Sequence, residues 1–159
     1  VIKSKIEGYR SRAAFKLIEI NSKFNIIKKD SNLLDLGSCP GGWSQVASKI
    51  VSKGKIVSVD IKEMKPINNV KFVKKDFLQE ESQNFILSYF GKKIDVIISD
   101  MAADTTGNRD LDSIRTNSIC LEVLNFSSKI LNSKGILVSK IFMGQDFELV
   151  KKEAKKKIQ

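Results

Sequence analysis

A glycine-rich turn between a strand pattern and a helix pattern is the feature that most constrains how this chain folds. Residues 33–45, LLDLGSCPGGWSQ, begin as an apolar run, turn through Gly37 to Gly42 and continue with helical spacing. In an open α/β sheet such a junction lies at the carboxyl end of a strand, where ligands bind, and glycine lets the backbone approach a ligand closely. The turn therefore predicts a small-molecule site on an α/β fold.

Strand and helix patterns alternate along the whole chain. Apolar runs of strand type lie at residues 33–36, 55–60, 70–74, 95–99 and 136–141. Helical patterns lie at residues 12–24 behind a Ser11 cap, at 46–51, at 85–90, at 111–131 and, rich in lysine, at 145–159. This alternation predicts one α/β domain over residues 1–159, with five parallel strands and right-handed crossovers.

The composition excludes several classes of protein and of site. With 42% hydrophobic and 29% charged residues, the 159-residue chain is globular in composition, and we expect no membrane span because no apolar run approaches roughly 20 residues. Its two cysteines suggest a reducing compartment. Because the sequence has no histidine, it contains no histidine-dependent triad and no histidine-ligated metal, and we expect no metal site.

The net charge of +10 has two explanations. Lysines that face phosphates gain affinity through counterion release, so the charge favours a nucleic-acid partner. However, only 4 of the 28 basic residues are arginine, which is typical of a lysine-rich composition encoded by an AT-rich genome. The charge alone does not decide between them.

The spacing of the glycines bears on the ligand. A dinucleotide fingerprint has glycines at relative positions one, three and six, and a P-loop ends in Gly-Lys-Ser/Thr, whereas here the glycines fall at positions one, five and six and no lysine follows. A pyrophosphate is therefore disfavoured. Asp60, Asp76 and Asp100 each follow a predicted strand and should lie at the same sheet edge as the turn.

These aspartates favour a nucleoside. Asp60 can accept hydrogen bonds from ribose hydroxyls, and Asp76 can accept from an adenine amino group, with Phe77 as an apolar wall. Each aspartate alone is more often a helix cap or turn residue, but three at successive strand ends shift the balance towards a ligand site. A nucleoside site without a phosphate grip fits S-adenosylmethionine, whose cationic sulfonium is favoured by nearby carboxylates.

Four ordered segments carry a family resemblance: YRSRAAFKL (9–17), LDLGSCPGGWSQ (34–45), SDMA (99–102) and SKIFMGQDF (139–147). Together they resemble the FtsJ/RrmJ family of ribosomal RNA 2′-O-ribose methyltransferases, and the match covers nearly the whole chain. The segment TGNRDLDSIR, 106–115, is more similar to the organellar branch. The resemblance implies a Rossmann-like methyltransferase sheet and S-adenosylmethionine as cofactor. It also implies a uridine of large-subunit ribosomal RNA as the target, a monomer, and an organelle matrix, such as that of mitochondria, or a bacterial cytoplasm.

The resemblance also implies roles for individual residues. Lys16, Asp100 and Lys140 match three members of a Lys-Asp-Lys-Glu tetrad, with Lys140 as the general base. The positions that match cofactor-binding residues of the family are Gly41, Trp43, Asp60, Asp76 and Asp100. We add four candidates from the sequence pattern, which are Gly37, Pro40 and Gly42 of the turn and Phe77 beside Asp76.

The sequence departs from the family pattern in two places. It reads Ala102-Ala103-Asp104 where relatives often read Ala-Pro-Asn, which changes the stiffness and charge of that loop. We expect the final glutamate and two further C-terminal strands of the family to follow residue 159.

The implied mechanism is an in-line methyl transfer to a ribose 2′-hydroxyl whose proton is removed by a lysine. A lysine has an ordinary pKa of roughly 10.4, so a lysine base needs burial or a neighbouring cation, and we expect Lys16 beside Lys140 to supply the cation. Arg10 and Arg12 are candidate RNA contacts, and the cluster at 151–157 is a weaker one.

The sequence leaves three alternatives open. Relatives within the family also methylate tRNA or cap RNA, and nothing in the sequence identifies the target nucleotide. A non-catalytic RNA-binding relative would keep the same fold. A nicotinamide-dependent oxidoreductase is disfavoured by the glycine spacing.

Overall fold

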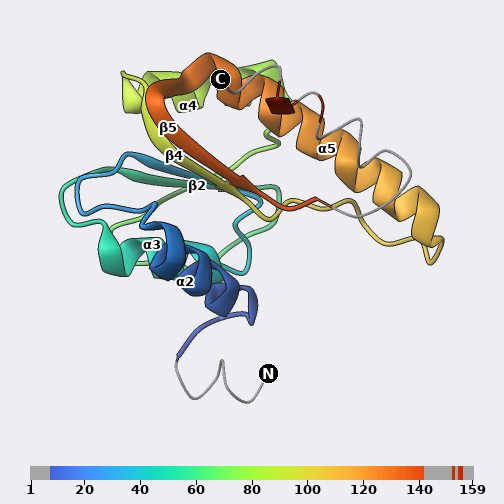
Figure 1. Cartoon of the computed structure of the whole chain (residues 1–159), viewed down its shortest axis with the longest axis horizontal. Coiled ribbons are helices and arrows are strands. Elements are labelled where there is room, and N and C mark those ends of the chain that lie inside the picture. The colour runs from blue at the N-terminus through green and yellow to red at the C-terminus, as the bar shows by residue number, and fades with distance from the viewer. Residues whose placement is uncertain (1–7, 142–151, 153, 156–159) are drawn as a thin grey trace.

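The computed structural model describes residues 8–141, 152, 154 and 155, and shows a five-stranded parallel sheet between two helical layers (Figure 1). The strands lie in the order β3-β2-β1-β4-β5. Their bounds are β1 Leu33–Leu36, β2 Ile56–Asp60, β3 Lys71–Lys74, β4 Ile94–Ser99 and β5 Leu131–Ser139. The helices are α2 Ala13–Phe24, α3 Gly42–Ile50, α4 Glu80–Phe90 and α5 Arg109–Ile130. The predicted parallel α/β sheet is confirmed.

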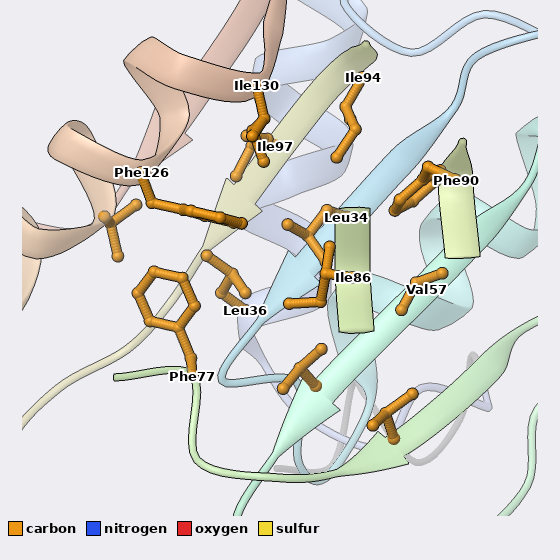
Figure 2. Packing of buried hydrophobic residues seen from close by; sticks show 13 residues of the cluster. Leu34, Leu36, Val57, Phe77, Ile86, Phe90, Ile94, Ile97, Phe126 and Ile130 are labelled. Atoms are coloured by element: carbon orange, nitrogen blue, oxygen red, sulfur yellow. The ribbon is translucent and has the colours of Figure 1, made fainter. Parts of the chain in front are cut away.

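Alternating apolar side chains on the central strands build a core on each face of the sheet. From β1, Leu34 and Leu36 pack with α4 and α5, whereas Leu33 packs on the opposite face with α2 and α3. Figure 2 shows the first of these cores, in which Phe77 and Phe126 meet edge to face at 5.1 Å between ring centroids. Strands covered on both faces read as continuous apolar runs, which is why the sequence revealed them.

The helix α2 is less regular than its sequence pattern suggested. Ala14 and Leu17 are buried as predicted, but Ile18 and Phe24 are 36% and 62% exposed. The predicted Ser11 cap is wrong, because the N-cap position is Arg12 and no side chain caps the helix. Instead, the indole Nε1 of Trp43 donates to the carbonyl oxygen of Ala13 at 2.7 Å and joins the start of α2 to α3.

Two further boundaries differ from the prediction. The strand β5 begins at Leu131, which pairs with Ile94, and regular pairing resumes at Ile136 after an irregular stretch, so the predicted start at 136 marks only the regular part. The helix α4 begins at Glu80 rather than near 85, because its first turn is acidic and has no apolar period to read. Acidic side chains stabilise a helix N-terminus through its dipole.

Most of the predicted lysine-rich helix at 145–159 lies outside the described residues. Among the helices of the described part of the chain, none has both the length and the hydropathy that a membrane crossing requires.

Candidate active site

A cavity of about 600 Å³ opens at the carboxyl edge of the sheet, where β1, β2 and β4 end. The glycine turn contributes Gly37 to its wall, and the strand ends contribute Asp60, Asp76 and Asp100, so the three predicted aspartates and the turn are brought together. A volume of this size suits a nucleoside-sized ligand. The remaining wall comes from the segments after β2 and β3, which include Lys62 and Lys75, from the loop after β4, and from α5, which contributes Arg115.

The glycine turn has a conformation that requires glycine at two positions. Gly37 has φ +73°, and a Cβ there would lie 2.5 Å from Cγ of Met101. Gly41 has φ +119° and lies beside Arg10 and Met64. Any side chain at either position would meet backbone strain, because L-residues rarely adopt positive φ. The turn can therefore bring its backbone against the loop after β4.

A second, smaller cavity of about 20 Å³ adjoins the first on the side of α2. Gly37, Cys39 and Asp100 line both cavities and mark where they meet. The other predicted turn residues, Pro40, Gly42 and Trp43, line this smaller cavity together with Ser11 and Ala13. The predicted cofactor residues thus divide between a large compartment and a narrow one, except Gly41, which is in the lining of neither.

Asp60 and Asp76 are both fixed by hydrogen bonds from the backbone. The carboxylate of Asp60 accepts from the amide of Cys39 at 2.8 Å and from the amide of Lys62 at 2.9 Å. Asp76 accepts from the amide of Leu78 at 3.0 Å. These bonds give both residues a turn-forming role, and each carboxylate oxygen still has a lone pair for a ligand.

Asp100, which lines both cavities, forms an ion pair with Lys140. Their Oδ1 and Nζ atoms are 3.8 Å apart, and each side chain is 36% exposed. Burial raises the pKa of Asp100 above its ordinary value, and the Lys140 ammonium opposes that rise. The amide of Lys140 also donates to the carbonyl of Ser99 at 2.8 Å, which ties the end of β5 to β4. The fold therefore places these two predicted tetrad members within reach of one another.

Lys16 is placed differently from the expectation. Its side chain is 66% exposed, and its Nζ lies 3.8 Å from Glu19 in the same helix. Within the described residues, the structure shows no ion pair between Lys16 and Asp100. The position of Lys16 beside Lys140 stays a prediction.

Arg10 is held by the site rather than pointing freely into solvent. Its guanidinium donates to the backbone carbonyls of Pro40 at 3.1 Å, Lys65 at 2.6 Å and Pro66 at 2.9 Å. Its amide donates to the side chain of Gln45 at 2.8 Å. Arg10 therefore fastens the glycine turn to the loop after β2, while Arg12 is exposed at the start of α2.

Sequence reasoning missed several residues around the cavity. Phe77 is in the lining of the cavity but is only 2% exposed and packs mainly in the core, so most of the accessible apolar surface comes from Ile61 and Leu78, together with Met101 and Ile119. Ile61 and Leu78 are 62% and 46% exposed. A signal was present, because each is an aliphatic residue just beyond a strand-end aspartate.

Asp35 is a second residue that sequence reasoning missed. It is fully buried in β1, where one carboxylate oxygen accepts from the hydroxyl of Ser44 at 2.6 Å and the other has no hydrogen-bond partner. Burial raises the pKa of Asp35 to about 7, and the charges of Asp100 and Asp60 add to the rise. The signal was a carboxylate inside an otherwise apolar strand, next to the glycine turn.

Comparisons with known proteins identify the family of this chain. A model of the FtsJ-like methyltransferase family matches residues 9–159. The chain is 47% identical over 147 residues to a protein of Pelagibacter ubique named "Ribosomal RNA large subunit methyltransferase E", covering 92% of this chain and 72% of the relative. A protein of the same name from Rickettsia akari is 43% identical over 150 residues, with 91% of this chain and 66% of the relative covered. The chain thus spans about two thirds of the length of these relatives.

A solved structure supports the same assignment. The crystal structure of a protein of Plasmodium falciparum, named "ribosomal RNA methyltransferase, putative", superimposes with a TM-score of 0.84. It is 33% identical to this chain, and the match covers 93% of this chain and 86% of that one. Family model, sequence relatives and fold therefore agree, and the chain belongs to the FtsJ-like methyltransferase family.

Proposed function

We propose that this chain methylates a ribose 2′-hydroxyl of large-subunit ribosomal RNA, with S-adenosylmethionine as the methyl donor. The observation that carries the proposal is the Asp100–Lys140 pair, because Asp100 lines the nucleoside-sized cavity and holds a lysine side chain next to it. The names of the relatives supply the substrate class. The organellar branch stays a prediction, since two of the three relatives named above are bacterial.

The residues present fit an adenosyl sulfonium. Asp60 and Asp76 offer carboxylate lone pairs to a ribose and an adenine, and Ile61 and Leu78 offer apolar surface. No lysine lies within the glycine turn to favour a phosphate. Asp100 would lie near the sulfonium, whose positive charge favours the ionised carboxylate. When bound, the cofactor supplies an electrophilic methyl carbon.

In its neutral form, Lys140 would take the proton from the 2′-oxygen as that oxygen gains the methyl group, and Asp100 would hold the amine in position. Nζ would become an ammonium and the donor would leave as a neutral thioether, so atoms and charge balance. Lys16 would join the site by leaving Glu19. An exposed ion pair stabilises by at most about 1 kcal/mol, so RNA phosphates can replace it.

Transfer of labelled methyl groups to ribosomal RNA tests the proposal. We expect the label to appear in large-subunit RNA or particles. The RNA backbone should resist alkaline cleavage at one labelled ribose, because a methylated 2′-oxygen cannot attack the adjacent phosphate. Label in tRNA or capped RNA instead would reassign the substrate. RNA binding without any transfer would indicate a non-catalytic relative and overturn the proposal.

A further inference from the structure

Four lysines and an exposed phenylalanine gather at the amino edge of the sheet, opposite the cavity. We call this group the Phe24 patch, and its members are Lys23, Phe24, Lys28, Lys29 and Lys53, all of them exposed. The two loops that carry it are joined, because the carbonyl of Lys29 accepts from the amides of Ser52 at 2.9 Å and Lys53 at 2.8 Å. One acidic residue, Asp30, lies in the same turn and reduces the charge without cancelling it.

The exposure of Phe24 is unusual for this molecule. At 62% it equals that of Ile61, and the other large apolar residues exposed in the described part of the chain are less accessible. Ile61 faces the cavity, which accounts for its exposure. Phe24 faces solvent among lysines, with the Nζ of Lys23 5.4 Å from its ring centroid. An exposed aromatic ring within a basic surface is the arrangement that proteins use to stack an unpaired base.

The cavity wall carries charges of both signs. Its charged side chains are Asp60, Asp76, Asp100, Asp104, Lys62, Lys75 and Arg115. The aspartates outnumber the cations and suit a sulfonium, so we expect lysines outside the cavity to supply much of the electrostatic affinity for an RNA.

The helix α2 connects the two places. Its N-terminal end reaches the smaller cavity, which Ser11 and Ala13 line, and its C-terminal end carries Phe24. The exposed side chains Arg12, Lys16 and Lys23 follow one another along the helix between these ends. A 12-residue helix is about 18 Å long, a distance that a folded RNA bridges readily.

We propose that the Phe24 patch is a second RNA-binding surface, in which the lysines contact backbone phosphates and Phe24 stacks on an unpaired base. The inference rests on the proposed function only in taking large-subunit ribosomal RNA as the RNA that binds. It implies that the substrate is a folded RNA that reaches along α2 from the target ribose to the amino edge.

The test compares two variants of the full chain with equal changes in charge. The patch variant carries Lys23→Gln, Lys28→Gln, Lys29→Gln and Lys53→Gln. The control variant carries Lys71→Gln, Lys92→Gln, Lys129→Gln and Lys134→Gln, which are exposed lysines outside the patch. A third variant is Phe24→Ala, with Phe85→Ala on α4 as its control. Thermal unfolding and S-adenosylmethionine titration establish that each variant is folded and binds cofactor like the parent.

Filter binding of transcribed large-subunit ribosomal RNA at several salt concentrations is the readout. We expect the patch variant to flatten the slope of log K against log salt by about 0.9 for each phosphate that a lysine no longer neutralises, and the control variant to change it much less. Phe24→Ala should weaken binding about tenfold and Phe85→Ala should not. Equal weakening in the patch and control variants, or unchanged binding by the patch variant, would overturn the inference. Since binding is read without methyl transfer, failure of the proposed function would appear separately, as an inactive parent protein.

Discussion

The two edges of the sheet differ in how their charges are arranged. At the carboxyl edge, four aspartates line a cavity together with Lys62, Lys75 and Arg115, and Lys140 is paired with Asp100, whereas the loops at the amino edge carry exposed lysines. Helix dipoles explain part of this contrast, because helix N-termini lie at the carboxyl edge and C-termini at the amino edge. Acidic residues in the first turns of α4 and α5, and lysines in the last turns of α2, α3 and α5, fit that rule.

The dipole does not explain the whole contrast. Its effect falls off within the last turn of a helix, and Lys28, Lys29 and Lys53 lie beyond the helix ends. Stabilisation of helix ends therefore does not account for these three lysines. The carboxyl edge thus combines carboxylates and cations around a cavity, whereas the amino edge presents exposed lysines to a polyanion.

Loss of Lys140 should have the largest effect at the carboxyl edge. We expect Lys140→Ala to lower methyl transfer by about 10²- to 10⁴-fold, because the proton acceptor is gone, with cofactor affinity changed little. Single-turnover transfer of labelled methyl groups measures the rate, and titration monitored by Trp43 fluorescence measures binding. Lys134→Ala, at an exposed position of β5, is the matched control. Near-normal turnover of Lys140→Ala would show that Lys140 is not the general base.

The buried Asp35 should make the protein less stable as pH rises. Its pKa is about 7 in the folded protein and about 3.9 when unfolded, so between these values the unfolded chain loses a proton that the folded protein keeps. The free energy of unfolding therefore falls as pH rises from about 4 to about 7. Three pKa units correspond to about 4 kcal/mol, which is the upper limit of the effect.

The variant Asp35→Asn isolates this effect, since an amide does not titrate. We expect it to equal or exceed the parent in stability at pH 8 and to lose the advantage at pH 5. Urea unfolding at the two pH values measures the difference. A parallel decline of variant and parent with pH would show that Asp35 is ionised in the folded protein.

Much of the carboxyl edge could be predicted from sequence, because local signals mark it. The glycine turn and the strand-end aspartates lie at positions that parallel topology must bring together, and in the structure Gly37 and Cys39 line one cavity with all three aspartates. The burial of the β1 leucines also followed from a continuous apolar run.

Contacts between distant segments could not be predicted in this way. Arg10 reads as a free basic residue beside Arg12, but its partners are carbonyls about 30 and 55 residues away, which no local pattern encodes. Phe24 has helical spacing that suggests burial, yet α2 ends before the sheet can cover it. Side-chain placement of this kind depends on tertiary packing rather than on periodicity.

Variants of Arg10 distinguish two roles for this residue at the carboxyl edge. Arg10 either contacts RNA or holds the glycine turn in place. Arg10→Ala removes three charge-assisted hydrogen bonds to backbone carbonyls, so we expect cofactor affinity to fall about tenfold. Arg10→Lys should not restore it fully, because an ammonium lacks the planar fork that reaches several acceptors. Isothermal titration with S-adenosylmethionine measures the affinity, with Arg12→Ala as the control. Unchanged cofactor affinity together with a flatter salt slope for RNA would instead assign Arg10 to RNA binding.

The smallest expected effect concerns the loop after β4, which walls the cavity. Hydrogen bonds from the hydroxyl and amide of Thr106 lower the pKa of Asp112 below its ordinary value. A carboxyl whose folded pKa is depressed stabilises the protein above the unfolded pKa, near 3.9, and loses that contribution as pH falls through the folded value. We therefore expect Asp112→Asn to be slightly less stable than the parent at pH 7 and to lose less stability between pH 5 and pH 3. Thermal unfolding across that range measures it, and equal pH dependence in both proteins would show that Thr106 does not depend on the Asp112 charge.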